Sequence, residues 1–220
     1  KASDLTDEPI TATQVETLFA FLQDMQVVSV FATADIHGNY IPYTSSDGKF
    51  EIGSVARIKT VMNEVEARLG EDHVIYVDGG DSPYNTTLAN VSMGNVSVDA
   101  LSALGLDATV LGNHDFDYSL ENLLRLRDRA QYAMLSANTK FKEGKAYAGE
   151  KEYPFGDYIT KEAAGLKFGI FGVTDDQSAA TTLYSNTYDI EWDDDLTTAK
   201  TLVSRLKNEE SCDVVIALSH

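Results

Sequence analysis

The sequence predicts an α/β fold with a largely parallel sheet. Short apolar runs alternate with segments of helical periodicity, and several of these runs end in clusters of Asp, Asn and His. Such alternation is typical of βαβ units, in which the carboxyl ends of parallel strands meet at one edge of the sheet. No internal repeat or low-complexity run interrupts the pattern, so the 220 residues predict one large domain.

Strands are expected at seven apolar runs that are rich in β-branched residues. They cover 27–34, 73–78, 107–111, 132–137, 153–159, 166–173 and 213–218. The runs 27–34 and 166–173 are interpreted as buried strands, because they are short, apolar and bounded by polar residues.

Helices are expected between these strands. A stripe formed by Val55, Ile58, Met62, Val65 and Leu69 predicts a helix over 53–69 that Gly70 ends, and this stripe is core packing. A further helix is expected within 1–25, where Val15, Leu18, Phe19 and Leu22 share a face. Three more are expected over 96–104 before Gly105, from the N-cap Ser119 onward, and after the acidic run 193–195.

Composition limits the classes of function. Lys plus Arg is 17 and Asp plus Glu is 35, and the resulting net charge of −18 argues against nucleic-acid binding because it repels phosphates. Phosphate chemistry therefore requires local cations, for which bound metals are the obvious source. No apolar run approaches the length of a transmembrane helix. Cys212 is the only cysteine and is expected to be a small buried residue.

Four of the expected strands end in residues that can bind a metal. These are Asp35 and His37, then Asp81, then Asn113 and His114, and finally His220. Imidazole nitrogens mixed with carboxylate oxygens suit Zn, Mn or Fe. Asp35 and His37 are two residues apart, so on an extended segment they face the same side. Asp81 follows two glycines, which allow a sharp turn, and its carboxylate can bridge two metals.

Each motif has a simpler explanation when it is taken alone. An Asp after a strand, such as Asp35, commonly caps a turn, and His220 would be a terminal residue only. For His73 the structural role is preferred, because it begins a strand and has only Glu71 and Asp72 as acidic neighbours. The combination of the motifs, in this order and at strand ends, outweighs these separate explanations.

As a set, these residues resemble the calcineurin-like metallophosphoesterases, and the resemblance covers roughly residues 27–220. Its motifs are Asp35-x-His37, Gly80-Asp81, Gly112-Asn113-His114-Asp115 and a strand that ends in His220. The sequence is most similar to the branch of secreted 5'-nucleotidases and 2',3'-cyclic phosphodiesterases, through the segments 111–118, 136–139, 169–174 and 214–220.

The resemblance implies a four-layer α/β/β/α sandwich over residues 27–220. The residues before it, 1–26, lie outside the resemblance and are expected to form an acidic, helical extension. The resemblance implies two divalent metal ions, Mn, Zn or Fe, one held by Asp35, His37 and Asp81 and the other by Asp81, Asn113 and His220. It also implies a catalytic dyad of His114 and Asp117, with Asp115 supporting the loop through hydrogen bonds.

The function implied is metal-dependent hydrolysis of nucleotide phosphate esters, outside the cell, at its surface or in the periplasm. The family closes its site with a later Gly-His-x-His segment, and this branch grips the nucleoside with a separate C-terminal domain. This chain stops at His220, so a fragment of a longer protein is expected. Two alternatives stay open: hydrolysis of another ester (a cyclic nucleotide, a sugar nucleotide or a sulfur ester), and a module that binds a metal or ligand without turnover.

Overall fold

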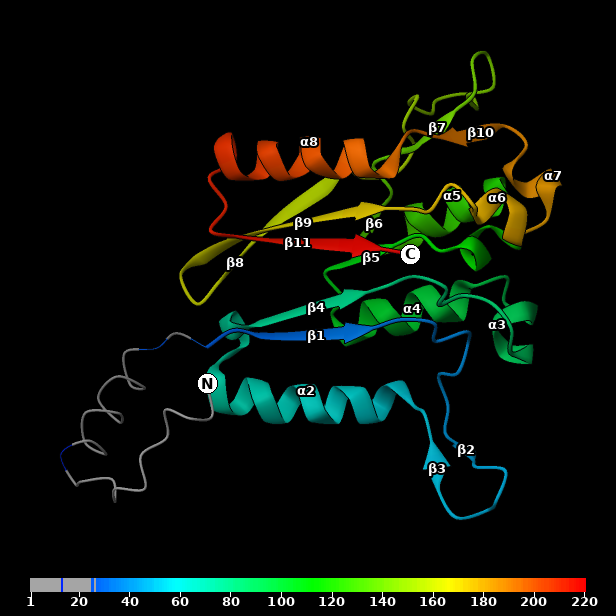
Figure 1. The fold of residues 1–220 in the computed structure, drawn as a ribbon. Helices are drawn as coiled ribbons and strands as arrows, with labels where there is room; N and C mark the ends of the chain where they lie inside the picture. The colour runs from blue at the N-terminus through cyan, green and yellow to red at the C-terminus, as the bar shows by residue number, and fades with distance from the viewer. Residues whose placement is uncertain (1–12, 14–24, 26) are drawn as a thin grey trace, which may run out of the picture.

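The fold is a sandwich of two β-sheets in a computed structural model that describes residues 13, 25 and 27–220 (Figure 1). The helix expected within residues 1–25 lies outside the described residues. The first sheet has the order β1-β4-β5-β6 and all of its neighbouring strands are parallel. Its strands are β1 (Ser29–Thr33), β4 (Val74–Asp78), β5 (Ala108–Val110) and β6 (Ala133–Leu135).

The second sheet has the order β11-β9-β8. Its strands are β8 (Tyr158–Ala163), β9 (Leu166–Val173) and β11 (Val214–Ser219). β9 and β11 are parallel, whereas β8 pairs with β9 in an antiparallel hairpin. The strand expected over 153–159 is therefore wrong for most of its length. Pro154 lies in that run and has no N–H to donate to a ladder, so β8 begins only at Tyr158.

Helices cover both outer faces of the sheet pair. The helices α2 (Val55–Leu69) and α4 (Asn95–Leu104) lie against the first sheet, and α8 (Asp195–Asn208) lies against the second. Figure 1 shows the resulting order of helix, sheet, sheet and helix. The four-layer α/β/β/α arrangement expected from the resemblance is thus confirmed.

Three apolar clusters hold these layers together. The cluster between the sheets contains Ile75, Val77, Val110, Phe168 and Ile170. The cluster under α2 and α4 contains Met62, Tyr76, Leu101 and Leu104, and the one under α8 contains Phe171, Leu202, Leu206 and Cys212. Cys212 is buried, as expected. Since burial of apolar surface is the main favourable term in folding, these clusters fix the sheets against each other.

The predicted helix ends match the capping that the structure shows. α5 (Leu120–Arg129) begins after Ser119, whose hydroxyl oxygen accepts a hydrogen bond from the Asn122 N–H. α8 begins after Asp194, whose carboxylate accepts from the Thr197 N–H at 2.7 Å. Gly105 follows α4 in the left-handed conformation, at φ 84°.

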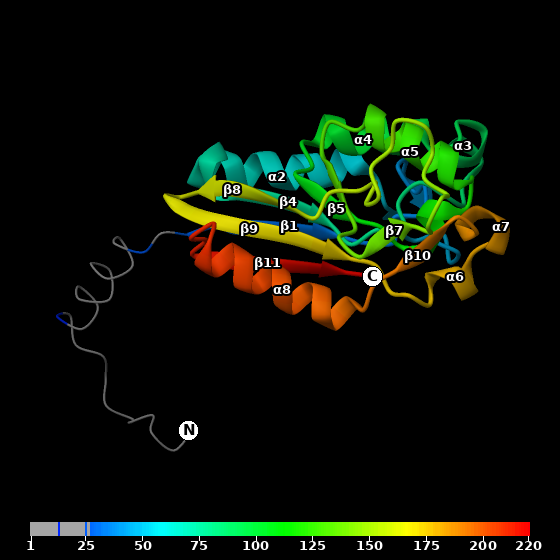
Figure 2. The same cartoon turned by 90° about the horizontal axis from the view of Figure 1, so that it is seen from above.

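The sequence did not predict the short elements. These are the hairpin of β2 (Tyr43–Thr44) and β3 (Glu51–Ile52), the pair of β7 (Thr139–Phe141) and β10 (Ile190–Trp192), the helices α3 (Thr87–Val91), α6 (Ser178–Thr181) and α7 (Tyr184–Thr187), and the 3₁₀ turns η2 (Glu71–His73) and η3 (Asn113–Phe116). Segments of two to five residues are too short to show a period. Figures 1 and 2 place α3, α6 and α7 beyond the carboxyl ends of the strands.

The expectation that the first strand is buried is wrong. β1 lies at the edge of its sheet, its residues alternate between partly buried and exposed, and Val30 keeps 47% of its surface accessible. Neighbouring β4 lies between β1 and β5 and is buried throughout. Among the described residues, no helix is both long enough and apolar enough to span a bilayer.

Candidate metal centre

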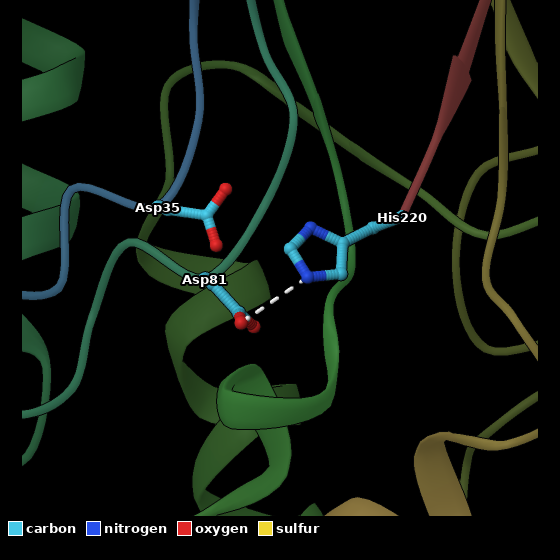
Figure 3. Close-up of side chains that lie close together, drawn as sticks. All are labelled: Asp35, Asp81 and His220. Carbon is cyan, nitrogen blue, oxygen red and sulfur yellow. Dashed lines mark ion pairs between the residues drawn. The ribbon is translucent and has the colours of Figure 1, made fainter.

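The carboxyl ends of three strands bring acidic and imidazole side chains to one edge of the sandwich. Asp35 and His37 follow β1, Asp81 follows β4, and His220 follows β11. Figure 3 shows that Asp35, Asp81 and His220 converge from three separate strand ends. One potential ligand atom from each of these three side chains lies within 4.8 Å of the others.

His37 joins this cluster at slightly longer range. Its Nε2 lies 3.6 Å from Asp35 Oδ1 and 4.0 Å from Asp81 Oδ2, while His220 Nε2 lies 3.2 Å from Asp81 Oδ2. The other ring nitrogen of His220, Nδ1, lies 2.6 Å from the carbonyl oxygen of Gly79. That contact fixes the orientation of the His220 ring, which turns Nε2 towards Asp81.

The backbone of the cluster is turned, not extended. Asp35, His37 and Asp81 all have positive φ, at 53°, 48° and 59°. The extended segment expected for Asp35 and His37 is therefore wrong; turns stabilised by bonds to the β4 loop bring their side chains together. The N–H of Asp35 donates to Gly80 O, and the N–H of His37 donates to Asp81 O, both at 3.0 Å. Left-handed conformations cost about 1–3 kcal/mol each for such residues, and they cluster at functional sites.

Two glycines leave the space that the cluster occupies. Gly80 has φ +94°, and a Cβ there would lie 2.8 Å from both Gly112 N and Val110 O. A Cβ on Gly112 would collide with the Asp81 carboxylate and would lie 2.9 Å from His220 Cδ2. Glycine at these positions therefore lets the β4 and β5 loops approach each other closely around Asp81.

The charges of the cluster are coupled. Burial raises the pKa of Asp81, but hydrogen bonds from His220 and from the His114 N–H outweigh burial and lower that pKa below its usual value. The hydrogen bond to Asp81 raises the pKa of His220 to about 9. Asp115 is fully buried, which raises its pKa to about 7. Its carboxylate accepts from the N–H groups of Asp81 (2.9 Å) and Gly112 (2.8 Å), so it supports the loops through hydrogen bonds.

The donor set fits a divalent metal. Among the described residues, the ion-pair partners of Asp35 and Asp81 are His37 and His220, and no lysine or arginine pairs with either carboxylate. His37 Nδ1 is buried and has no hydrogen-bond partner among the described residues. Two carboxylates and two imidazoles at one point are ligands that Zn, Mn and Fe accept.

The dyad of His114 and Asp117 lies beside this cluster. His114 Nδ1 lies 2.6 Å from Asp117 Oδ2, and the His114 ring contacts the His37 ring edge-on with centroids 5.1 Å apart. Asn113 begins η3 just before His114, and its Nδ2 donates to the Thr181 carbonyl at 3.3 Å. Among the described residues no hydrogen bond reaches Asn113 Oδ1, the atom through which an amide binds a metal.

Three residues around the dyad had no signal in the sequence. Tyr84 stacks on the His114 ring with centroids 5.4 Å apart and planes 4° from parallel. Thr182 donates from its hydroxyl to Asp117 Oδ1 at 2.8 Å, and Asn186 Nδ2 donates to the Asp117 carbonyl at 2.9 Å. Thr182 and Asn186 are more than sixty positions from Asp117, and no motif or periodicity marks them.

Comparisons with known proteins agree with this geometry. The sequence profile of the family described as calcineurin-like phosphoesterase matches residues 28–220. The chain is 28% identical to the 5'-nucleotidase of Vibrio vulnificus and 30% identical to that of Bos taurus, over 88% of this chain and 33% of each relative. It is 28% identical to the protein UshA of Escherichia coli over 93% of this chain and 36% of UshA. The chain thus spans about a third of the length of these curated relatives.

Solved structures show the same fold. A 5'-nucleotidase precursor from Thermus thermophilus superposes with a TM-score of 0.73 at 24% identity, over 88% of this chain and 37% of the other. The sulfate thiohydrolase SoxB from Thermus thermophilus superposes with a TM-score of 0.74 at 15% identity, over 87% of this chain and 43% of the other. These likenesses support the arrangement of layers described above.

Proposed function

Because the chain belongs to the calcineurin-like phosphoesterase family, we propose that it is the metal-binding catalytic domain of a hydrolase that cleaves nucleotide phosphate esters. The observation that carries this proposal is the convergence of Asp35, Asp81 and His220 at one sheet edge, next to the pair of His114 and Asp117. The relatives named 5'-nucleotidase support a nucleotide as the substrate class.

The proposed centre holds two divalent ions, Mn, Zn or Fe. Asp35, His37 and Asp81 would hold one ion, and Asp81, Asn113 and His220 would hold the other, with the Asp81 carboxylate shared. When bound, such a pair supplies an activated water and neutralises the charge on the phosphate oxygens. Asp81 suits the shared position, because its side chain is only 3% exposed and the N–H of His114 already fixes one of its oxygens.

His114 would act on the ester itself. Asp117 accepts the hydrogen bond from His114 Nδ1, so Nε2 is the ring nitrogen left to face a substrate. When the ring carries a proton on each nitrogen, Nε2–H can stabilise charge on the phosphoryl group or give its proton to the leaving oxygen. Such a positioned acid–base group contributes roughly a hundred- to ten-thousand-fold in rate. The presence of both members of this pair favours an enzyme over a binding module.

The proposal extends to the rest of the protein. Residues 27–220 would form the catalytic domain, with residues 1–26 as an extension. The relatives are about three times as long as this chain, which supports a further C-terminal domain that grips the nucleoside. By the resemblance to secreted 5'-nucleotidases, we further propose a location outside the cell, at its surface or in the periplasm.

A panel of phosphoesters tests this function on the full-length protein with Mn or Zn added. We expect nucleoside monophosphates to be hydrolysed fastest, and faster than cyclic nucleotides, sugar nucleotides or sulfur esters. Faster turnover of one of those esters would replace the proposed substrate class, and no turnover of any ester would favour the binding module. His114→Ala is the matched variant: turnover should fall roughly a hundredfold or more while metal content stays intact. Loss of metal together with activity would make His114 a ligand.

A further inference from the structure

The segment that contains α6 and α7 reaches back to the catalytic dyad. Thr182, between these two short helices, donates its hydroxyl hydrogen to Asp117 Oδ1 at 2.8 Å. Asn186, in α7, donates to the Asp117 carbonyl at 2.9 Å. In the other direction along the chain, Asn113 Nδ2 donates to the Thr181 carbonyl at 3.3 Å. Residues 181–186 are therefore tied to the η3 loop at three points beyond the carboxyl ends of the strands (Figure 1).

Of these three contacts, the one from Thr182 acts on the carboxylate that holds His114. Asp117 Oδ2 contacts His114 Nδ1 at 2.6 Å, and Asp117 Oδ1 accepts from Thr182. Both oxygens of one carboxylate are thus engaged, and its side chain is only 13% exposed. A carboxylate anchored at a single oxygen can rotate about its terminal bond, whereas one anchored at both oxygens has its plane fixed.

The His114 ring is confined on its faces as well. The Tyr84 ring lies parallel to it at 5.4 Å and in turn packs edge-on against Tyr118. The Tyr118 hydroxyl donates to Asn90 Oδ1 at 2.8 Å, which anchors this aromatic pair. Tyr84 therefore limits tilting of the imidazole, and the fixed plane of the Asp117 carboxylate limits its rotation. Together they leave a single orientation for Nε2.

We propose that Thr182 is a positioning residue for the proposed reaction, acting on His114 through Asp117. Its hydroxyl fixes the plane of the carboxylate that accepts from His114 Nδ1–H, so that Nε2 points to the reacting phosphoryl group. This inference rests on the proposed function for its effect on rate, but the orientation of the ring is a property of the protein itself. Precise placement matters because small displacements of a catalytic group reduce rates strongly.

The kinetic test removes one hydroxyl at a time from the full-length, metal-loaded protein. Thr182→Val keeps the shape of the side chain, and we expect kcat to fall roughly tenfold while KM changes by no more than about twofold. Thr182→Ser restores the hydroxyl and should recover most of kcat. Thr181→Val is the matched control, because among the described residues the Thr181 hydroxyl bonds to the carbonyls of Gln177 and Ser178 and not to Asp117. A Thr182→Val variant with unchanged kcat would overturn the proposal.

A spectroscopic test separates this inference from the proposed function. The chain has four histidines, so ¹⁵N spectra of the rings are simple, and His114→Ala identifies the His114 signals. At a pH where the ring is neutral, wild type should show one Nδ1–H tautomer, and Thr182→Val and Thr182→Ala should show a mixture. Thr181→Val should match wild type. Unchanged His114 signals in both Thr182 variants would refute the positioning role, whether or not the protein hydrolyses a phosphoester. If wild type hydrolyses no phosphoester, that result alone would refute only the proposed function.

Discussion

The two ends of the sheet pair differ in the partners of their acidic side chains. At the amino end, Asp107 precedes β5, and its two carboxylate oxygens lie 2.6 and 2.7 Å from Lys161 Nζ. The same carboxylate accepts from the Tyr76 N–H at 2.9 Å. At the carboxyl end, Asp35 and Asp81 lie close together, and their only ion-pair partners among the described residues are His37 and His220.

The two ends differ in how their carboxylate charges are balanced among the described residues. The amino end has its own lysine, so its charges balance within the protein. At the carboxyl end, the contact with Asp81 raises the pKa of His220 to about 9. A divalent cation would replace the proton on His220, because metal ligands must be deprotonated. Charge balance, more than the mere presence of Asp and His, thus distinguishes a metal centre from a structural ion pair.

The histidines follow the same division. His73 lies in η2 at the amino end, where its Nδ1 contacts the Val27 carbonyl at 2.7 Å. His37, His114 and His220 lie at the carboxyl end, within contact of an Asp carboxylate. One residue type therefore serves two purposes, and the edge of the sheet at which it lies separates them.

The largest effect is expected from Asp81→Asn. This change removes the carboxylate that both proposed metals share, so metal content after dialysis should drop and turnover of the full-length protein should fall about a thousandfold or more. Elemental analysis and a phosphoesterase assay measure the two. Asp107→Asn is the matched control at the amino end and should keep its metal. If Asp81→Asn retained the wild-type metal content, the charge-balance contrast between the two ends would not hold.

An intermediate effect is expected from Lys161→Met at the amino end. The substitution leaves the partly buried Asp107 without its cation, and stability to chemical denaturation should fall by about 1–2 kcal/mol. Metal content should not change, since Lys161 lies at the opposite end from the metal centre. The double variant with Asp107→Asn should recover part of the loss. A change in metal content in either variant would show that the two ends are coupled.

The smallest effect is expected from His73→Gln. The side chain is partly exposed, and its contacts are the Val27 carbonyl and, at 4.0 Å, the exposed Asp72 carboxylate, so stability should change by about half a kcal/mol or less. Thermal unfolding with and without added metal measures both the stability and the metal response. A lost metal response would place His73 in the functional set and remove the distinction between the two ends.

The long elements could be predicted because their periodicity extends over many residues. β9 lies over Leu166–Val173 as expected, and α2 ends at Leu69, before Gly70. The pair of β7 and β10 could not be predicted, because two strands of three residues pair across about fifty positions of sequence. The exposure of β1 also depends on its place at the sheet edge, which composition does not reveal.

The candidate site divides along the same line. Asp35, Asp81 and His220 follow strands, and parallel strands bring such positions together by topology, so a single sequence suffices to expect the cluster. The left-handed backbone of Asp35 was not predicted, because it is held by tertiary hydrogen bonds such as the one from the Asp35 N–H to Gly80 O. Tyr84 and Thr182 were missed for a related reason: their contacts arise from loop packing, for which no residue spacing exists.

The central claim is that divalent metal binds between Asp35, His37, Asp81 and His220. Anomalous diffraction from crystals soaked in Mn tests it most directly, with data collected on either side of the Mn absorption edge. The geometry of the cluster predicts strong anomalous density among these four side chains. It also predicts that His220 Nε2 faces the metal and no longer contacts Asp81. Density elsewhere on the surface, or none among these side chains at saturating Mn, would contradict the claim.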